Sequence, residues 1–503
     1  MCLGLEAIGL LGALLIASLM IFGCSGAGVV DKRLSNPIVS TAPGTIIAEN
    51  AKPGTTTWQI SDAALNNEIE GFASLTSVNR GEDINIFVNT TDPTYVMELF
   101  RMGWYGGAGG RAVTDPIIRT GTKQPTPSPD PTTHLVECQW NDPYQLHIPN
   151  SSDPTDWASG VYLVKLTGGA SGKQNYIIFV VRDDARSSDL LFQSSVTTFE
   201  AYNNWGGWSL YTQPRAYMVS FDRPYVGNEG AGDFFYFEYS MVRFLEREGY
   251  DVTYSTDVDT HARGPLVLFH RGFLSVGHDE YWSWEMRNHL ETARGIGESL
   301  GFFGANTAYF QIRFQTSSLA RAPDRTIVCY KSVSLDPLGS DKDPEVRRHT
   351  TTQFRLDPVN RPEDALVGVM YQSFFYDLQD MVIADASSWV FEGTGLRNGD
   401  HLPGLLGYES DQMFGHAPPS TKVIANSPYT DIRGRNYNSD MTVYTTAEGS
   451  SVVATGSMRW NWGLDDFGQH PVLTNTAVQQ ATRNILKKFG ATSHTEIAHP
   501  GGI

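Results

Sequence analysis

The chain has 503 residues, with 37 Lys and Arg against 55 Asp and Glu, which gives a formal net charge of −18. This acidic balance excludes a typical nucleic-acid binder, which needs a basic face to pair with phosphates. Hydrophobic residues make up 41% of the chain, enough for packed cores, so bulk disorder is excluded as well. Aromatic residues reach 12% and charged residues only 18%, and we interpret this composition as that of an exported protein.

An apolar leader opens the sequence. Residues 7–23 form an unbroken run of apolar or small side chains, which is typical of an export signal. Residues 21–24 resemble a bacterial lipobox, in which Cys24 would be lipidated after cleavage. We therefore expect a signal or lipoprotein leader over residues 1–29 and an exported protein, either extracellular or attached to the membrane through Cys24. An uncleaved anchor is the alternative.

A linker and a β-rich domain are expected next. Residues 30–56 are polar and contain Pro, Gly and Thr, which is typical of a linker. Between residues 57 and 186, short alternating strands separated by turn residues predict an immunoglobulin-like β-sandwich. The clearest strand signals are at Ile84–Val88, Tyr95–Arg101, Gly160–Leu166 and Tyr176–Val181, and the last two predict a hairpin.

The chain has few cysteines that could form disulfide bonds. Four cysteines in 503 residues cannot form a disulfide scaffold, and two of them lie in the leader. Cys138 and Cys329 remain for the folded part of the chain. They either pair or form two separate buried thiols.

From residue 187 to 490 the pattern changes to strands that alternate with helices. This alternation predicts an α/β domain with a mainly parallel sheet covered by helices, with extra β-rich insertions after residue 335 and a tail at 491–503. The expected strands are Asp189–Gln193, Tyr250–Tyr254, Pro265–His270 and Ser299–Phe303, and the expected helices are 235–248, 281–294 and 472–489.

Sites in open parallel sheets form in the turns beyond the carboxyl ends of the strands. The turn after the first strand, within residues 199–225, is dense in Tyr, Trp and Asn, which favours either a binding loop or an aromatic interface with the sandwich. The next turn contains His278 and Glu280, a possible acid–base and metal-binding pair, although a helix cap also explains part of this pattern. Asn306 follows the last strand and either binds substrate or caps a helix.

Five motifs occur together in this part of the chain, at Ala201–Gly207, Ser220–Tyr225, Gly277–Trp282, Gly304–Asn306 and Gly407–Asp411. In this order and spacing, residues 187–490 resemble the C-terminal catalytic domain of the N,N-dimethylformamidase large (beta) subunit. The resemblance implies a doubly wound fold like that of class I glutamine amidotransferases, in agreement with the predicted parallel sheet.

The resemblance also implies a mononuclear iron, Fe³⁺, held by two tyrosines and one glutamate. Tyr202 matches the first tyrosine and Glu280 matches the glutamate. The sequence departs from the formamidase between residues 205 and 225, so the second tyrosine has three candidates. Tyr217 is preferred over Tyr211 and Tyr225.

Three further residues match the site of the formamidase. His278 corresponds to a histidine two residues before the metal glutamate, and Asn306 to an asparagine on the next strand end. Both are implied to serve substrate and catalysis. Glu409 matches a further acidic site residue.

These residues predict a metal-dependent hydrolase of carbon–nitrogen bonds, in which a metal-activated water attacks an amide carbonyl. The alternative is a non-catalytic exported protein that binds carbohydrate or a cell-envelope partner. Hydrolysis of an ester or glycoside through Glu280 and Glu409 is a third possibility. The expected partner is a small amide or a saccharide-like molecule.

Overall fold

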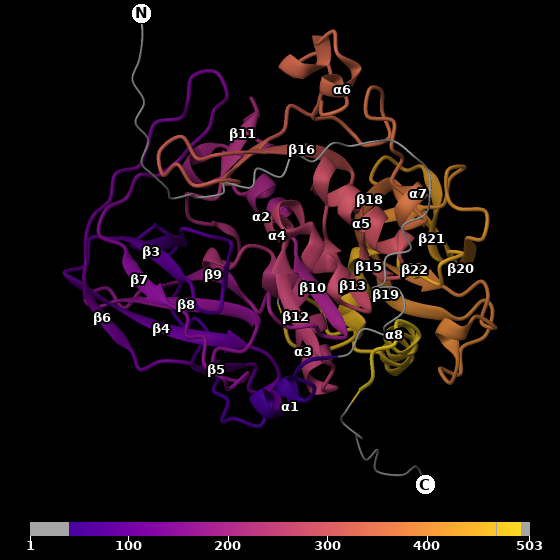
Figure 1. Ribbon diagram of the computed structural model, residues 1–503, viewed down its shortest axis with the longest axis horizontal. Coiled ribbons are helices and arrows are strands. Elements are labelled where there is room, and N and C mark those ends of the chain that lie inside the picture. Colours follow the sequence, from indigo (N-terminus) through magenta and orange to yellow (C-terminus); the bar gives the residue numbers. More distant parts are fainter. Residues whose placement is uncertain (1–39, 469, 494–503) are drawn as a thin grey trace, which may run out of the picture. The chain divides into compact units, whose positions relative to one another are not determined.

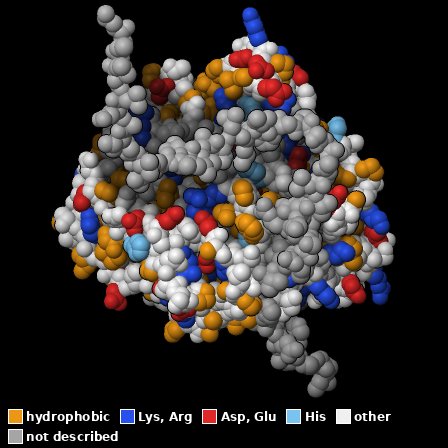
Figure 2. Space-filling model, in the orientation of Figure 1, with side chains coloured by type: hydrophobic (Ala, Val, Ile, Leu, Met, Phe, Trp, Pro, Cys, Tyr) orange, Lys and Arg blue, Asp and Glu red, His pale blue; other side chains and the backbone are white. Residues whose placement is uncertain are grey.

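The computed structural model describes residues 40–468 and 470–493 (Figure 1). The predicted leader at 1–29 with Cys24, the start of the predicted linker and the end of the predicted tail lie outside the described residues. Within the described ranges, no helix has both the length and the apolar composition to cross a membrane. Acidic and basic side chains are interspersed over the described surface that Figure 2 shows.

The segment expected to be a linker is packed against the fold in its described part. Helix α1 (Thr45–Asn50) lies within it, and its Glu49 is fully buried. Glu49 accepts hydrogen bonds from the Tyr105 hydroxyl and from the Arg111 guanidinium, both at 2.7 Å. A polar composition suggested a loose connection, but these buried polar contacts fix the segment onto the strands that follow.

The β-rich region from Ile69 to Arg182 contains two sheets that share one apolar core. The first has the strand order β1-β3-β7, and the second has the order β2-β9-β8-β4-β5, with β6 paired to β4. The predicted hairpin is confirmed, because β8 and β9 pair antiparallel. The immunoglobulin-like topology stays a prediction. The strands are β1 (Ile69–Ala73), β2 (Ser77–Asn79), β3 (Asp83–Thr90), β4 (Thr94–Met102), β5 (Gly110–Ala112), β6 (Ile117–Thr120), β7 (Tyr144–His147), β8 (Gly160–Gly168) and β9 (Gln174–Arg182).

A seven-stranded mixed sheet forms the centre of the α/β region, with the order β12-β10-β13-β15-β22-β21-β20. The first five strands are parallel, and β21 and β20 continue the sheet antiparallel. The chain leaves β10 for β12 on one side and returns to β13 on the other, so the strand order reverses there. The strands are β10 (Leu190–Ser194), β12 (Val252–Thr256), β13 (Gly272–His278), β15 (Ser299–Ala305), β20 (Lys422–Thr430), β21 (Asn436–Thr445) and β22 (Ser451–Ala454).

One predicted strand is wrong. The apolar run at Pro265–His270 lies mostly in a 3₁₀ helix, Gly264–Phe269, and the strand is β13, which follows it. Pro265 stands at the start of this helix, where its fixed φ and missing N–H are tolerated, whereas it would remove a hydrogen bond from a central strand. The strand therefore ends at His278 rather than at His270.

Helices and small sheets complete the α/β region (Figure 1). Two small sheets have the orders β11-β17-β16-β14 and β18-β19. Their strands are β11 (Met218–Ser220), β14 (Tyr281–Ser283), β16 (Phe310–Gln315), β17 (Thr326–Val328), β18 (Met370–Val382) and β19 (His401–Gln412). The helices are α2 (Val196–Tyr202), α3 (Tyr239–Arg247), α4 (Asp257–Ala262), α5 (Trp284–Gly295), α6 (Pro344–Arg347), α7 (Asp364–Val367) and α8 (Thr476–Lys488). Cys138 and Cys329 are separate buried thiols.

Candidate functional site

The candidate site lies beyond the carboxyl ends of β10, β13 and β15. Tyr202 ends the helix that follows β10, His278 ends β13, and Asn306 directly follows β15. The reversal of strand order between β10 and β13 is where open α/β sheets form their binding crevices. Three residues predicted from separate motifs are therefore brought to the same edge of the sheet.

Glu280 is at the centre of the site. The Tyr202 hydroxyl donates to its Oε2 at 3.0 Å, and the Tyr211 hydroxyl lies 3.1 and 3.0 Å from its two oxygens. Tyr281 donates to the Tyr211 oxygen at 2.6 Å. The main-chain N–H of Glu280 donates to the Thr198 hydroxyl at 2.9 Å, which fixes the turn against α2. Two tyrosines thus converge on one buried carboxylate.

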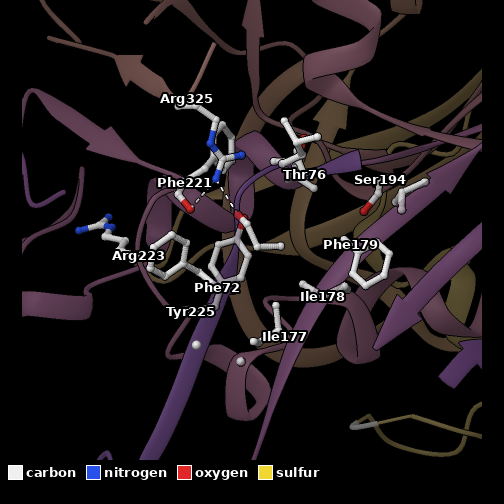
Figure 3. Close-up of a pocket in the computed structure, with 16 residues that line it drawn as sticks. Phe72, Thr76, Ile177, Ile178, Phe179, Ser194, Phe221, Arg223, Tyr225 and Arg325 are labelled. Atoms are coloured by element: carbon white, nitrogen blue, oxygen red, sulfur yellow. Dashed lines mark hydrogen bonds between the residues drawn. The ribbon is translucent and has the colours of Figure 1, made fainter. Parts of the chain in front are cut away.

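The structure places Tyr211, and not the preferred Tyr217, beside Glu280. The Tyr217 ring stacks on Tyr330 at a centroid distance of 4.9 Å. Tyr225 lies in an apolar cleft between β1, β9 and the 221–225 segment (Figure 3). The rings of Tyr202 and Tyr211 stack at 4.1 Å, and each exposes an edge to solvent. Of the three candidates for the second tyrosine, Tyr211 is therefore the one whose hydroxyl contacts Glu280.

A buried arginine shapes the loop that carries Tyr211. The Arg223 guanidinium donates to the carbonyl oxygens of Asn203, Trp205 and Trp208 at 2.8–3.1 Å, and it pairs with the carboxylate of Glu200. The loop then returns to α2, since the N–H of Leu210 donates to the carbonyl of Ala201. This return sets the tyrosine after Leu210 on top of the tyrosine after Ala201.

A second clamp lies behind this loop. Arg325 donates to the carbonyl oxygens of Ala73 and Phe221, both at 2.9 Å, as the dashed lines in Figure 3 show. It also pairs with Asp222 at 2.8 Å. The motif at 220–225 therefore serves the architecture of the loop and its attachment to β1, while the groups of the candidate site come from neighbouring segments.

His278 is wedged between two carboxylates. Its Nε2 lies 3.0 Å from Oε2 of Glu409 and 3.4 Å from Oε2 of Glu280. Burial disfavours the charged imidazolium, but the carboxylates of Glu409 and Glu280 overcome this and raise the pKa of His278 to about 10. Glu409 comes from β19, which brings the β-rich insertion to the sheet edge.

Buried polar atoms with unmet hydrogen bonds gather at this point. Nε2 of His278 and Oε2 of Glu409 lie 3.0 Å apart as an ion pair but without hydrogen-bond geometry, and Oδ1 of Asn306 has no hydrogen-bond partner. The main chain of Asn306 is held with φ 58°, and its N–H donates to Asp411 at 2.8 Å. Buried polar groups are usually hydrogen-bonded, so several atoms with unmet hydrogen bonds in one place indicate a binding site for a ligand or ion.

Close packing of two glycines lets the strands carry these groups. Gly277 of β13 pairs with Gly304 of β15, and Gly277 has φ +77°. A Cβ atom on Gly304 would lie 2.2 Å from the Gly277 carbonyl oxygen, and one on Gly277 would lie 2.5 Å from Cβ of Phe237. Only glycine fits at either position. Gly277 directly precedes His278, and Gly304 lies two positions before Asn306.

Asp279, between His278 and Glu280, has a structural role. Its carboxylate accepts hydrogen bonds from the side chains of Gln193, Ser275 and Trp282 at 2.7–2.8 Å. These contacts point into the protein, away from the tyrosines on Glu280. The middle residue of the motif thus anchors the turn, and its two neighbours face the site.

Lys331 belongs to the site but carries no recognisable sequence signal. Its Nζ lies 3.5 Å from the centroid of the Tyr211 ring and 5.1 Å from that of Tyr281. Burial lowers the pKa of the ammonium group, and the Glu280 carboxylate opposes this effect. A lone lysine three residues after a buried strand cannot be assigned to a site from sequence, because the contact is made across the fold.

Among residues 40–468 and 470–493, His, Cys, Asp and Glu alone form no group of three or more that could hold a metal ion. The remaining donors beside Glu280 are tyrosine hydroxyls. Burial and the Glu280 carboxylate raise the pKa of Tyr202 and Tyr211 well above the usual range. Any metal bound here would therefore depend on tyrosine oxygen.

Comparison with solved structures adds no support for a function. A chain of the Pseudomonas fluorescens alkylpurine DNA glycosylase AlkC, bound to DNA containing an abasic site analogue, is 14% identical and has a TM-score of 0.15. The match covers 23% of this chain and 30% of that one, so it carries no argument. No curated protein matches the chain.

Comparison with protein families gives a clear match. The model of the N,N-dimethylformamidase beta subunit-like C-terminal domain matches residues 96–475, more than half of the chain. The match contains all the site residues described above. It begins within β4, so it extends beyond the 187–490 region of the predicted resemblance into the β-rich part. The chain therefore belongs to the N,N-dimethylformamidase beta subunit-like family, through its C-terminal domain.

Proposed function

We propose that this protein is a metal-dependent hydrolase of amide carbon–nitrogen bonds. The observation that carries the proposal is the convergence of Tyr202, Tyr211 and His278 on the buried carboxylate of Glu280. This cluster lies at the sheet edge where α/β enzymes bind their substrates. The family to which the chain belongs is named after an amide hydrolase, which favours this reaction class.

The residues present fit a ferric ion. Tyr202, Tyr211 and Glu280 offer phenolic and carboxylate oxygens, which are hard ligands. As two phenolates and one carboxylate they would carry three negative charges, which would balance Fe³⁺ in a buried site. The ion-paired side chains of His278 and Glu409 lie beside them. When bound, such an ion acts as a Lewis acid that polarises a carbonyl and lowers the pKa of water.

His278 is placed to move the protons of the reaction. Amide hydrolysis adds water across the C–N bond, so a proton leaves the attacking water and a proton reaches the departing nitrogen. The carboxylates of Glu280 and Glu409 hold His278 as an imidazolium. Its Nε2 donates a proton to the departing nitrogen, and the proton that the attacking water releases restores the imidazolium. The products are a carboxylic acid and an amine.

Asn306 and Lys331 assist the residues of this cluster. Oδ1 of Asn306 is a buried acceptor without a donor, and the N–H group of an amide or of a departing amine supplies one. Lys331 places a positive charge against the Tyr211 ring, which favours the phenolate over the phenol. Both residues thus act on groups that the reaction changes.

Hydrolysis of a panel of small amides tests the proposal. Iron-loaded wild-type protein should release amine from at least one of formamide, N,N-dimethylformamide and acetamide. Glu280→Gln should lower the rate by about 100-fold or more, because it removes charge at the centre of the site. Glu298→Gln is the control, since Glu298 is a buried carboxyl group on the loop before β15. No hydrolysis of any of the three amides would count against the proposal.

A groove at the other end of the insertion favours saccharide binding as a second candidate function. None of the residues that line it is charged, and all except Pro428 are polar or aromatic, in a chain with a net charge of −18. Neutral amides and aromatic rings suit a neutral sugar. The lining residues are Gln379, Gln412, Pro428, Tyr429, Thr430, Asn436, Tyr437 and Asn438. Binding of maltoheptaose or cellohexaose that survives Glu280→Gln but not Tyr437→Ala would support this function.

A further inference from the structure

An outward bulge in β18 lies close to the site. Phe375 pairs with Tyr408 of β19, but the next pair is Gln379 with Leu406, so β18 has three residues between the pairs where β19 has one. The three residues between these pairs, 376–378, are exposed. Tyr376 has 72% of its surface accessible and Leu378 has 50%. An exposed aromatic ring in such a position indicates a contact surface, because bulges often redirect side chains at functional sites.

A buried arginine holds the bulge in shape. Arg459 is only 3% exposed, and its guanidinium donates to the carbonyl oxygens of Tyr376, Asp377 and Leu406 at 2.7–2.9 Å. Burial lowers the pKa of Arg459, which reflects the cost of keeping this cation away from water. The buried guanidinium therefore holds the main chain of an exposed segment and fixes the point from which the Tyr376 side chain extends.

A row of aromatic rings connects this bulge with the catalytic imidazole. The Tyr376 and Tyr408 ring centroids are 6.4 Å apart, and Tyr408 lies 6.3 Å from the His278 ring. On its other side, His278 lies 5.4 Å from Tyr202. Phe237 packs at 6.0 Å from both Tyr408 and His278. An apolar aromatic wall thus runs from the surface to the cluster of carboxylates.

We propose that Tyr376 and Tyr408 form an outer subsite that binds a flat apolar substituent of the substrate. The proposal rests on the proposed amide hydrolysis and names its substrate class, namely amides that carry an aryl group. Such a group would stack on the rings while its amide reaches His278. Stacking of aromatic rings adds to the burial of their surface, so aryl amides should bind more tightly than small formamides.

The test compares substrates of increasing length: N,N-dimethylformamide, formanilide and 4-phenylformanilide. Tyr376→Ala should raise KM for 4-phenylformanilide by about 3- to 10-fold, with much less effect on kcat. The increase in KM should be larger for this substrate than for N,N-dimethylformamide, and Tyr376→Phe should retain most of the wild-type preference. Leu378→Ala is the matched control from the same bulge and should change none of these values. Equal changes for all three substrates, or none, would overturn the proposal.

A binding measurement separates this proposal from the proposed function. Calorimetric titration of 4-phenylformanilide into wild-type protein and Tyr376→Ala needs no turnover. If the wild type hydrolyses none of the amides but Tyr376→Ala weakens binding, the subsite stands and the hydrolase assignment fails. If hydrolysis occurs but neither KM nor binding depends on Tyr376, the subsite fails and the hydrolase assignment stands.

Discussion

Two buried clusters of charged groups lie on either side of the loop after β10, and they differ in how well they are satisfied. In the Glu200–Arg223 cluster, the guanidinium meets one carboxylate and three carbonyl oxygens, and Asn203 donates to the remaining carboxylate oxygen. In the cluster around Glu280, polar atoms of His278 and Glu409 stay without a well-formed hydrogen bond.

The difference separates a structural role from a functional one. A fully paired buried cluster fixes one geometry, since any change leaves a charge without a partner. A cluster with unpaired polar atoms in a crevice has capacity left for a substrate or a metal. The first cluster builds the loop that carries Tyr211, and the second uses that tyrosine.

The largest effect on stability is expected from breaking the paired cluster. Arg223→Ala would leave the Glu200 carboxylate buried without its cation and three carbonyl groups without a donor. The free energy of unfolding should fall by about 3–5 kcal/mol. Urea denaturation followed by circular dichroism measures this change. Arg223→Lys should recover part of the loss, and a stable Arg223→Ala protein would contradict the structural role.

In the unpaired cluster, Tyr211→Phe should affect activity far more than stability. The variant keeps the ring stack on Tyr202 but removes the hydroxyl that contacts Glu280. The rate of amide hydrolysis should fall by about 100-fold, while the free energy of unfolding changes by about 1 kcal/mol. Tyr217→Phe is the matched control and should change neither quantity. The reverse pattern would restore Tyr217 as the site tyrosine.

Glu298 is a third buried carboxyl group. It has no hydrogen-bond partner, like some polar atoms of the candidate site, but it lies outside that site. Burial raises its pKa well above 4.5, and neither side-chain oxygen has a partner. The folded state therefore binds a proton that the unfolded state loses, so the free energy of unfolding contributed by this group falls as pH rises above 4.5. The slope is about 1.4 kcal/mol per pH unit.

The difference between wild type and Glu298→Gln isolates this contribution. Glutamine stays neutral, so the variant should become more stable than wild type as the pH increases from 5 to 8. Thermal or urea unfolding over this range measures the difference. Unchanged amide hydrolysis in the same variant would show that an unpaired buried carboxyl group alone does not make a site.

The sequence predicted most of the fold in the places where local pattern decides it. The alternating strand at Ile84–Val88 and the hairpin at 160–182 are present, as is the final helix, α8. The strand predicted at Pro265–His270 was wrong, because the pattern of a short apolar segment does not distinguish a strand from a buried helical turn. Only the neighbouring strands decide between them, since β10 already pairs with β13.

The site was predictable where residues follow strand ends and unpredictable where it depends on loops. His278, Glu280 and Asn306 follow directly from the order of strands in a parallel sheet. The choice of Tyr211 depends on the hydrogen bonds of Arg223 and on the return of Leu210 to α2, which no local pattern encodes. Lys331 reaches the site from a different small sheet and had no signal at all.

The metal content of the purified protein tests whether Glu280 and the two tyrosines form a metal-dependent centre. Elemental analysis after iron loading should find about one iron per chain in wild type and in Tyr217→Phe, and much less in Glu280→Gln and Tyr211→Phe. A folded wild-type protein that retains no metal, or a Glu280→Gln variant that retains as much as wild type, would contradict the proposed metal centre.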